Sequence, residues 1–308
     1  FGAQFLAMAF FVRTILPGHR LAAFFAGFIY WFNPGAVLGA PGLLTMYVGA
    51  YIPYMAALFI RTATSSRRRL LTPLFLLSIA ASGFLSINPP AFVLFAIFQV
   101  FIATYIIWRY RSSRDRVWPR VAMLGFLSIA VNLYWAVTLY YSLFGNKQTV
   151  VSAVTNVLDL SFVYQRDSIL NMFRLNPIWG WRYADIYPYA PAYSTPLLLV
   201  VVFVPALLAF SALLNRRIPR HVVLPATTVT LALLLICTAL HGPWQPINLF
   251  LFQHVPFFWL FRDPDTKFLG YIVILYAVLI GYQAEWLTGW IIHLIGRRWT
   301  AYMAPVSY

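Results

Sequence analysis

The chain has little charge, and acidic residues are especially rare. Only 9% of its 308 residues are charged, and 7 Asp and Glu stand against 22 Lys and Arg. Because soluble globular proteins carry about 25% charged residues, this composition excludes a soluble enzyme, a disordered tail and a coiled coil. The single cysteine, Cys237, can form no intrachain disulfide, which excludes a disulfide-stapled secreted domain.

The sequence also lacks the motifs of common soluble active sites. It has no Gly-rich phosphate loop, no Gly-x-Ser-x-Gly elbow, no His-Glu-x-x-His pair and no cysteine cluster. These absences argue against a hydrolase or nucleotidase of the soluble type.

Apolar segments of membrane length occupy most of the chain. Hydrophobic residues make up 62% of it, and the mean hydropathy is +0.76. A membrane-spanning helix needs about 17–25 predominantly apolar residues. By this measure we expect nine spans, at residues 1–16, 21–38, 43–60, 70–87, 91–108, 121–143, 197–214, 222–240 and 268–295. The run 197–204 is apolar on every side, whereas a barrel strand alternates, so we expect an all-α, polytopic integral membrane protein with one transmembrane domain over residues 1–308.

Lys and Arg are unevenly distributed between the two ends of these spans. One end takes only Lys147, Arg166, Arg174, Arg182, Arg262 and Lys267, and the remaining arginines fall at the other end. Since Lys and Arg concentrate on the cytoplasmic side, we expect the arginine-rich end in the cytoplasm and a multi-pass protein of the cell membrane. The net charge of +15 comes in short basic bursts between apolar segments, which predicts contact with lipid headgroups and not with nucleic acid.

Two connections on the expected extracytoplasmic side, 144–196 and 241–267, are longer than the joining of helices requires. Long loops in compact proteins are usually functional or disordered, and the many aromatic residues in these two argue against disorder. We therefore expect the working surface of the protein in these loops.

Charged residues gather where the second loop enters the last span. Arg262 and Lys267 flank this point, and both can reach a lipid-linked phosphate from it. Alternatively they snorkel to lipid headgroups, with Pro264 at the start of a helix. Asp263 and Asp265 have the Asp-x-Asp spacing with which many nucleotide-sugar transferases hold a divalent cation, Mg²⁺ or Mn²⁺. Acids at a helix start are also explained by the helix dipole.

The first loop mixes aromatic rings with charged residues. Aromatic rings stack on the apolar face of a sugar, while carboxylates and guanidiniums form hydrogen bonds with its hydroxyls. The same rings also fit the interfacial belt that is usual in membrane proteins. The candidate sugar contacts are Asp167, Asp185, Trp179, Trp181 and Tyr183, and Arg174 and Arg182 are candidate helpers at the phosphate.

Glu285 is the one carboxylate within an apolar segment. An ionisable residue in a span is a functional candidate by default. Its neighbours Gln283, Trp286 and Thr288 also fit a position at the cytoplasmic interface, so the sequence leaves both interpretations open.

Residues 5–40, 160–181 and 261–268 carry a family resemblance. The first stretch contains Pro17-Gly18-His19-Arg20, the second contains Trp179-Gly180-Trp181, and the third is Phe261-Arg262-Asp263-Pro264-Asp265-Thr266-Lys267-Phe268. In these stretches the chain resembles the GT-C polyprenyl-phosphate-dependent glycosyltransferases, especially the large cell-wall arabinofuranosyltransferases. The third stretch is similar to a signature of that family, with one additional residue between Pro264 and Lys267.

The resemblance implies transfer of a sugar from a polyprenyl-phosphate donor to an extracytoplasmic glycan or lipid acceptor. In that family a carboxylate of the first outer loop activates the acceptor hydroxyl, and cations stabilise the departing phosphate. The charge distribution directs the span 1–16 inward, so we expect a further span and that loop before Phe1, and we assign no catalytic base within the chain. Two alternatives remain, a catalytically silent structural subunit of a larger membrane assembly and a lipid-linked sugar flippase or other transporter.

Overall fold

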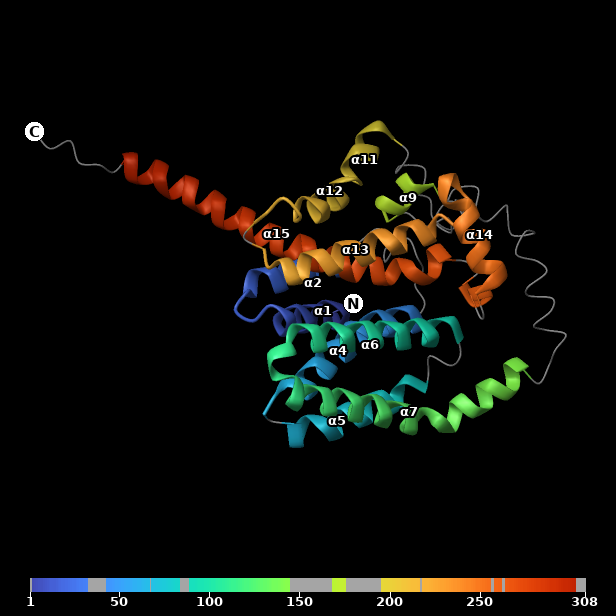
Figure 1. Ribbon diagram of the computed structural model, residues 1–308. Coiled ribbons are helices and arrows are strands. Elements are labelled where there is room, and N and C mark those ends of the chain that lie inside the picture. Colours follow the sequence, from blue (N-terminus) through green and yellow to red (C-terminus); the bar gives the residue numbers. More distant parts are fainter. Residues whose placement is uncertain are drawn as a thin grey trace, which may run out of the picture.

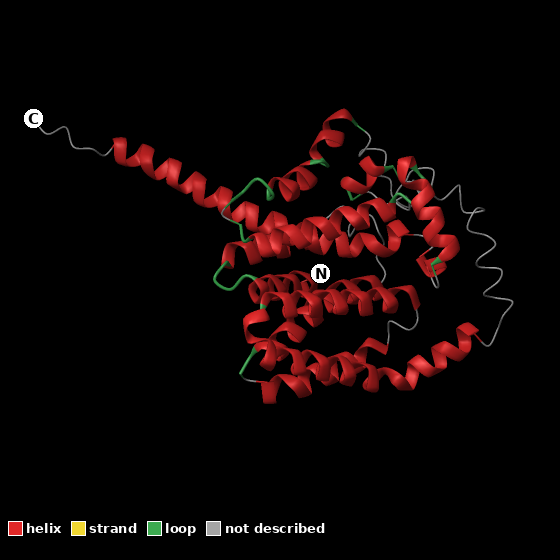
Figure 2. Ribbon diagram, viewed as in Figure 1, coloured by secondary structure: helices red, strands yellow, loops and turns green. Residues whose placement is uncertain are grey.

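The computed structural model describes residues 2–32, 43–66, 68–83, 89–144, 168–175, 195–216, 218–255, 258–261 and 264–302. These residues form helices joined by loops, and no strand occurs among them (Figure 2). In chain order the elements are α1 (Gly2–Ile15), α2 (Arg20–Trp31), α4 (Leu43–Thr64), α5 (Arg68–Ala80), α6 (Pro89–Arg109), η2 (Arg111–Ser113), α7 (Arg114–Phe144), α9 (Ile169–Phe173), α11 (Pro196–Val201), α12 (Val204–Ser211), α13 (Arg220–Cys237), η5 (Gly242–Trp244), α14 (Gln245–His254), η6 (Phe258–Phe261) and α15 (Pro264–Tyr302).

Four of these helices are long and apolar enough to cross a membrane. Their spanning segments are Pro90–Arg109, Asp115–Thr138, Arg220–Cys237 and Lys267–Ile295. Three further apolar helices, Gly2–Ile15, Arg20–Trp31 and Leu70–Gly83, are shorter than a typical span. The expected all-helical class is thus confirmed, and the four long helices indicate a multi-pass membrane protein; nine spans are not shown among the described residues.

The expected span 197–214 is divided in the structure. Helix α11 ends at Val201 and α12 begins at Val204, with Pro205 in the first turn of α12. Proline lacks a backbone N–H and its ring clashes with the preceding turn, so it favours a helix start over a helix interior, although α4, α5, α7 and α13 each contain one. One apolar run therefore yields two short helices.

Helix α15 is the centre of the bundle. In its most apolar stretch of 18 residues, 83% of the residues are buried, whereas the corresponding shares in α6 and α7 are 28% and 22%. It packs against α2, α12 and α13 (Figure 1). Small residues permit the closest of these approaches, because a Cβ atom added to Gly281 would meet the Ala22 carbonyl oxygen and lie 2.8 Å from the Ala26 Cβ.

The remaining helices extend the bundle away from α15. Helix α1 packs against α2 and α4, and α4 in turn packs against α5, α6 and α7. Figure 1 shows the resulting stack, with α13 and α15 above, α1, α4 and α6 in the middle, and α5 and α7 below. The last part of α15 continues past the bundle, where Trp290 and Ile292 are exposed.

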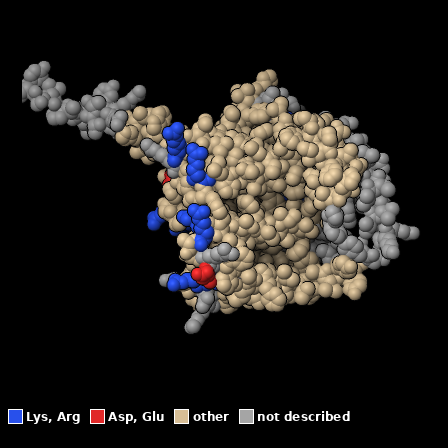
Figure 3. All heavy atoms as spheres, viewed as in Figure 1, with Lys and Arg blue, Asp and Glu red and all other residues tan. Residues whose placement is uncertain are grey.

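The lysines and arginines visible in Figure 3 gather at one end of the stack. We call it the basic end; it includes Arg13 of α1, Arg20 of α2, Arg61 of α4, Arg109 of α6 and Arg220 of α13. Arg61 joins two helices there, because its Nε donates to Thr14 Oγ1 at 3.1 Å and its guanidinium lies 4.5 Å from the centroid of the Phe10 ring. The opposite end carries α9, η5, α14 and η6 (Figure 1).

Candidate functional site

At the end opposite the basic end, a buried asparagine holds α14 across the end of α13. Asn248 is 2% exposed, and its Nδ2 donates to the Ala239 carbonyl at 2.7 Å and to the Leu235 carbonyl at 3.0 Å. The chain turns sharply at this point, since Ala239 has a φ of 46°, in the left-handed region that few residues other than glycine adopt. Asn248 satisfies two carbonyls that the end of α13 leaves without helical partners.

Helix α15 begins against the end of α13. The buried Cys237 thiol donates to the carbonyl of Pro264, the first residue of α15, at 3.5 Å. Proline suits this position because the first N–H groups of a helix have no helical acceptor. The Phe261 and Phe268 rings lie 5.3 Å apart and pack the preceding turn onto the first turns of α15. The amino-terminal end of α15, which carries partial positive charge, is thereby fixed at the opposite end.

Helix α9 comes from the first long loop and reaches into the bundle. Ser168 caps it by accepting a hydrogen bond from the Asn171 N–H at 3.3 Å. The Tyr276 hydroxyl donates to the Phe173 carbonyl at 3.2 Å, and Phe173 and Tyr276 both pack on the ring of Phe210. Tyr276 lies three turns into α15, about 18 Å from its start at 1.5 Å per residue. Short as it is, α9 therefore lies beside the spanning helices, with Met172 fully buried.

Arg174 follows α9 and is buried, at 9% exposure. The other arginines whose side chains the structure describes are exposed, apart from the half-buried Arg120. Burial lowers the pKa of the Arg174 guanidinium, but an arginine stays protonated in proteins because its ordinary pKa is so high. The segment around α9 thus brings a permanent positive charge into the interior at this end.

Three of the residues singled out in the sequence are described at this end. Lys267 is half-buried in the first turns of α15, Asp265 is fully buried in its first turn, and Arg174 is buried beside α9. The other candidates lie outside the described residues; they are Arg262, Arg182, Asp167, Asp185, Trp179, Trp181, Tyr183 and Asp263.

Of the proposed cation ligands, Asp265 is described and Asp263 is not. Within the described ranges, no group of three or more His, Cys, Asp or Glu side chains is arranged to hold a metal ion. Asp265 also has the position in the first turn where a carboxylate interacts favourably with the helix dipole. The helix dipole therefore explains the position of Asp265, and the expected cation stays a prediction.

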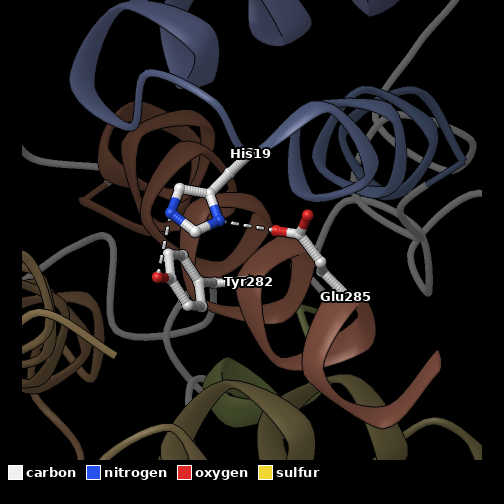
Figure 4. Close-up of polar contacts among 3 residues, drawn as sticks. All are labelled: His19, Tyr282 and Glu285. Carbon is white, nitrogen blue, oxygen red and sulfur yellow. Dashed lines mark hydrogen bonds and ion pairs between the residues drawn. The ribbon is translucent and has the colours of Figure 1, made fainter. Parts of the chain in front are cut away.

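A second polar cluster lies at the basic end (Figure 4). His19 Nδ1 and Glu285 Oε2 are 3.0 Å apart, and His19 Nε2 is 3.2 Å from the Tyr282 hydroxyl. Next to it, Asn215 Nδ2 donates to Gln283 Oε1 at 3.0 Å. Glu285 thus lies at the basic end, and the cluster ties the turn between α1 and α2 to α15.

Sequence reasoning singled out Glu285 but missed His19. The one signal in the sequence is the Pro17-Gly18 turn that precedes His19, and Gly18 indeed has a φ of 96°. A turn of this kind carries the histidine away from α1, but nothing in it identifies a partner on the last helix.

No protein-family model, curated protein sequence or solved structure matches this chain. Its functional interpretation therefore rests on its own residues.

Proposed function

We propose that this chain is a membrane glycosyltransferase of the GT-C type, which moves a sugar from a polyprenyl-phosphate donor to an extracytoplasmic glycan or lipid acceptor. The observation that supports it is the buried guanidinium of Arg174, which follows α9 where the Phe173 carbonyl meets Tyr276 of α15. A buried cation is costly to desolvate, and a charge retained beside spanning helices is typical of sites that handle ions or charged substrates.

Three positive features occur toward the end where α15 begins, in an otherwise acid-poor and apolar bundle. Arg174 supplies a full charge, Lys267 supplies a second from the first turns of α15, and the start of α15 contributes the partial charge of its unpaired N–H groups. A phosphate at the head of a lipid is the anion that fits, because its chain can remain among the apolar helices while its head reaches these groups. In the proposal, Arg262 and Arg182 join them.

The sugar is proposed to contact the aromatic and acidic residues of the first long loop. The candidates are Asp167, Asp185, Trp179, Trp181 and Tyr183. A divalent cation held by Asp263 and Asp265 is a further part of the proposal, and no step of the reaction is assigned to it. In the full proposal the chain has nine spans, the basic end is cytoplasmic and both long loops are extracytoplasmic.

The proposed reaction is a single displacement. The acceptor hydroxyl oxygen attacks the anomeric carbon, the bond from that carbon to the phosphate oxygen breaks, and the lipid phosphate leaves with the electron pair. A carboxylate takes the hydroxyl proton, and no described carboxylate is assigned this role. Arg174 and Lys267 stabilise the charge that grows on the phosphate, so their contribution is greater in the transition state than in the bound donor.

The first experiment measures binding of polyprenyl phosphate, with polyprenol of the same chain length as the uncharged control. Native mass spectrometry of the full-length protein should show retention of polyprenyl phosphate well above that of polyprenol. Arg174→Met and Lys267→Met should each lower the ratio of retained polyprenyl phosphate to retained polyprenol by about tenfold, because each removes one charge-assisted contact. Arg116→Met, a change at the basic end, is the matched control and should have no effect. Equal retention of the two lipids by the unchanged protein would refute the phosphate site.

The second experiment measures transfer from a polyprenyl-phosphate sugar in membranes that contain the full-length protein. Lys267→Met should lower the rate about 100-fold while the amount of inserted protein stays constant, as expected for loss of one group that stabilises transition-state charge. An unchanged transfer rate in the Lys267→Met variant would show that this half-buried lysine is not part of the site.

A further inference from the structure

The described helices leave a narrow groove in the half of the bundle nearest the basic end. It lies between α6 and α13, with α1 and α15 at its base, and its walls include Phe101, Tyr105, Pro225, Ala226 and Val278. The face drawn in Figure 3 is hollowed between the positions of α13 and α6. The groove is separate from the site proposed for sugar transfer, which lies at the opposite end.

The size and lining of the groove indicate an apolar chain as its occupant. The cavity has a volume of about 50 Å³, which is room for about four groups of water or methylene size at about 10–15 Å³ each. Its walls are apolar apart from Tyr105, so a water molecule would lack the two to four polar partners that hold ordered water in proteins. A sugar ring would lack partners in the same way.

Positive charge lies at the mouth of the groove. Arg109 is one turn beyond Tyr105 at the end of α6, and its charge acts electrostatically on both Tyr105 and His221. Arg220 begins α13, and the ring of His221 lies 6.5 Å from that of Trp108. Helix α1 contributes the wall residues Phe11 and Ile15, and its exposed Arg13 lies on the other side of the helix, at the same end of the bundle.

Little negative charge is available at this end to balance these three arginines. Among the described carboxylates, Glu285 pairs with His19 and Asp115 lies at the start of α7. None of the three arginines forms an ion pair with a described carboxylate. An apolar slot beside the exposed guanidinium of Arg109 is complementary to an acyl chain that carries an anionic headgroup.

We propose that this groove binds a segment of one acyl chain of an anionic membrane phospholipid, whose headgroup lies against Arg109. The lipid fills the space that α6 and α13 leave open above α15 and neutralises the charge at its mouth. Bound in this way, it stabilises the packing of α6 and α13 onto the central helix.

The test uses phosphatidylglycerol and phosphatidylcholine with identical acyl chains, added to the full-length protein in detergent and followed by native mass spectrometry. The protein should retain phosphatidylglycerol in preference to phosphatidylcholine. Arg109→Gln should reduce that preference about tenfold, whereas Arg116→Gln, an exposed change on α7, should leave it as it is. No preference in the unchanged protein would overturn the proposal.

The groove itself is tested by filling it. Ala226→Phe places a ring in the cavity and should abolish retention of the lipid, while Leu224→Phe, at a residue of α13 that is 46% exposed and outside the groove walls, should not. Equal retention by both variants would overturn the proposal.

If Ala226→Phe fails to insert, a phosphatidylglycerol with a photoactivatable acyl chain provides the test in the unchanged protein. Crosslinks concentrated near Phe101 and Pro225 support the groove, whereas equal labelling of the exposed face of α7 at Phe126 and Ile129 contradicts it.

Discussion

His19 Nδ1 and Glu285 Oε2 lie 3.0 Å apart although 266 residues separate them in the chain. The pair connects the turn between α1 and α2 to the central helix (Figure 4), at the end of the bundle where arginines predominate (Figure 3). Because the side chains are 38% and 23% exposed, water screens the interaction and its contribution to stability is modest.

We expect His19→Ala and Glu285→Ala to be coupled. A double-mutant cycle on thermal or denaturant unfolding should give an interaction energy of about 0.3–1 kcal/mol, the range of a partly exposed ion pair. Replacement of Tyr282 by Phe should reduce this coupling, because its hydroxyl is 3.2 Å from the second ring nitrogen of His19. Strict additivity of the two alanine variants would show that the residues do not interact in the folded protein.

The contact between α2 and α15 should tolerate no added atom at Gly281. Gly281→Ala brings a methyl group against the backbone of Ala22 and the side chain of Ala26, and we expect a loss of about 1–3 kcal/mol. Gly289→Ala is the control on the same helix, since a Cβ there meets nothing within 4 Å and alanine is the better helix former. In the same detergent, the unfolding midpoint should therefore fall for Gly281→Ala and rise for Gly289→Ala, relative to the unchanged protein. Equal stability would contradict the close approach.

Replacement of two side-chain amides by leucine, one in α6 and one in the neighbouring α7, should change the stability of the protein in opposite directions. Neither side-chain polar atom of Gln99 in α6 has a hydrogen-bond partner among the described residues, so we expect Gln99→Leu to stabilise the protein by about 1–2 kcal/mol. In α7, Asn132 Oδ1 accepts from Ser82 Oγ at 2.9 Å and from Trp135 Nε1 at 2.6 Å. Asn132→Leu should cost about 1–2 kcal/mol, because both donors are then left unsatisfied. Destabilisation by both changes would mean that Gln99 has a partner.

Removal of the Asn248 amide should loosen α14 without unfolding the bundle. Asn248→Ala leaves the carbonyls of Leu235 and Ala239 without this donor, and we expect faster hydrogen exchange across η5 and α14. Exchange in the spanning part of α6 should stay unchanged and serves as the internal control. Uniform acceleration in both regions would show that Asn248 contributes to global stability instead.

Much of the fold could be predicted from apolar segments alone, because burial in lipid and burial in protein demand the same residues. The expected spans 91–108 and 222–240 fall on α6 and α13, which begin or end at Arg109 and Arg220. The prediction of one span at 197–214 was wrong, because the composition there stays apolar while the helix is interrupted just before Pro205. Hydropathy measures side chains and does not register a missing N–H group.

The candidate site was predictable by residue type and not by position in space. Charge at the entry to the last span identified Lys267 and Asp265, and the charged first loop identified Arg174. The burial of Arg174 could not be foreseen, because it depends on the Phe173 carbonyl meeting Tyr276 across 103 residues. His19 was missed for the same reason, since neither member of a long-range pair carries a local signature of the other.

The central place of α15 has a consequence for biogenesis. The alanine face of α2 leaves the ribosome more than two hundred residues before the glycine that it finally meets, Gly281. During that interval the earlier helices can associate with one another but cannot complete their core. This core is therefore completed only when α15 inserts, and a chain that stalls before α15 would expose a surface that the quality-control proteases of the membrane can recognise.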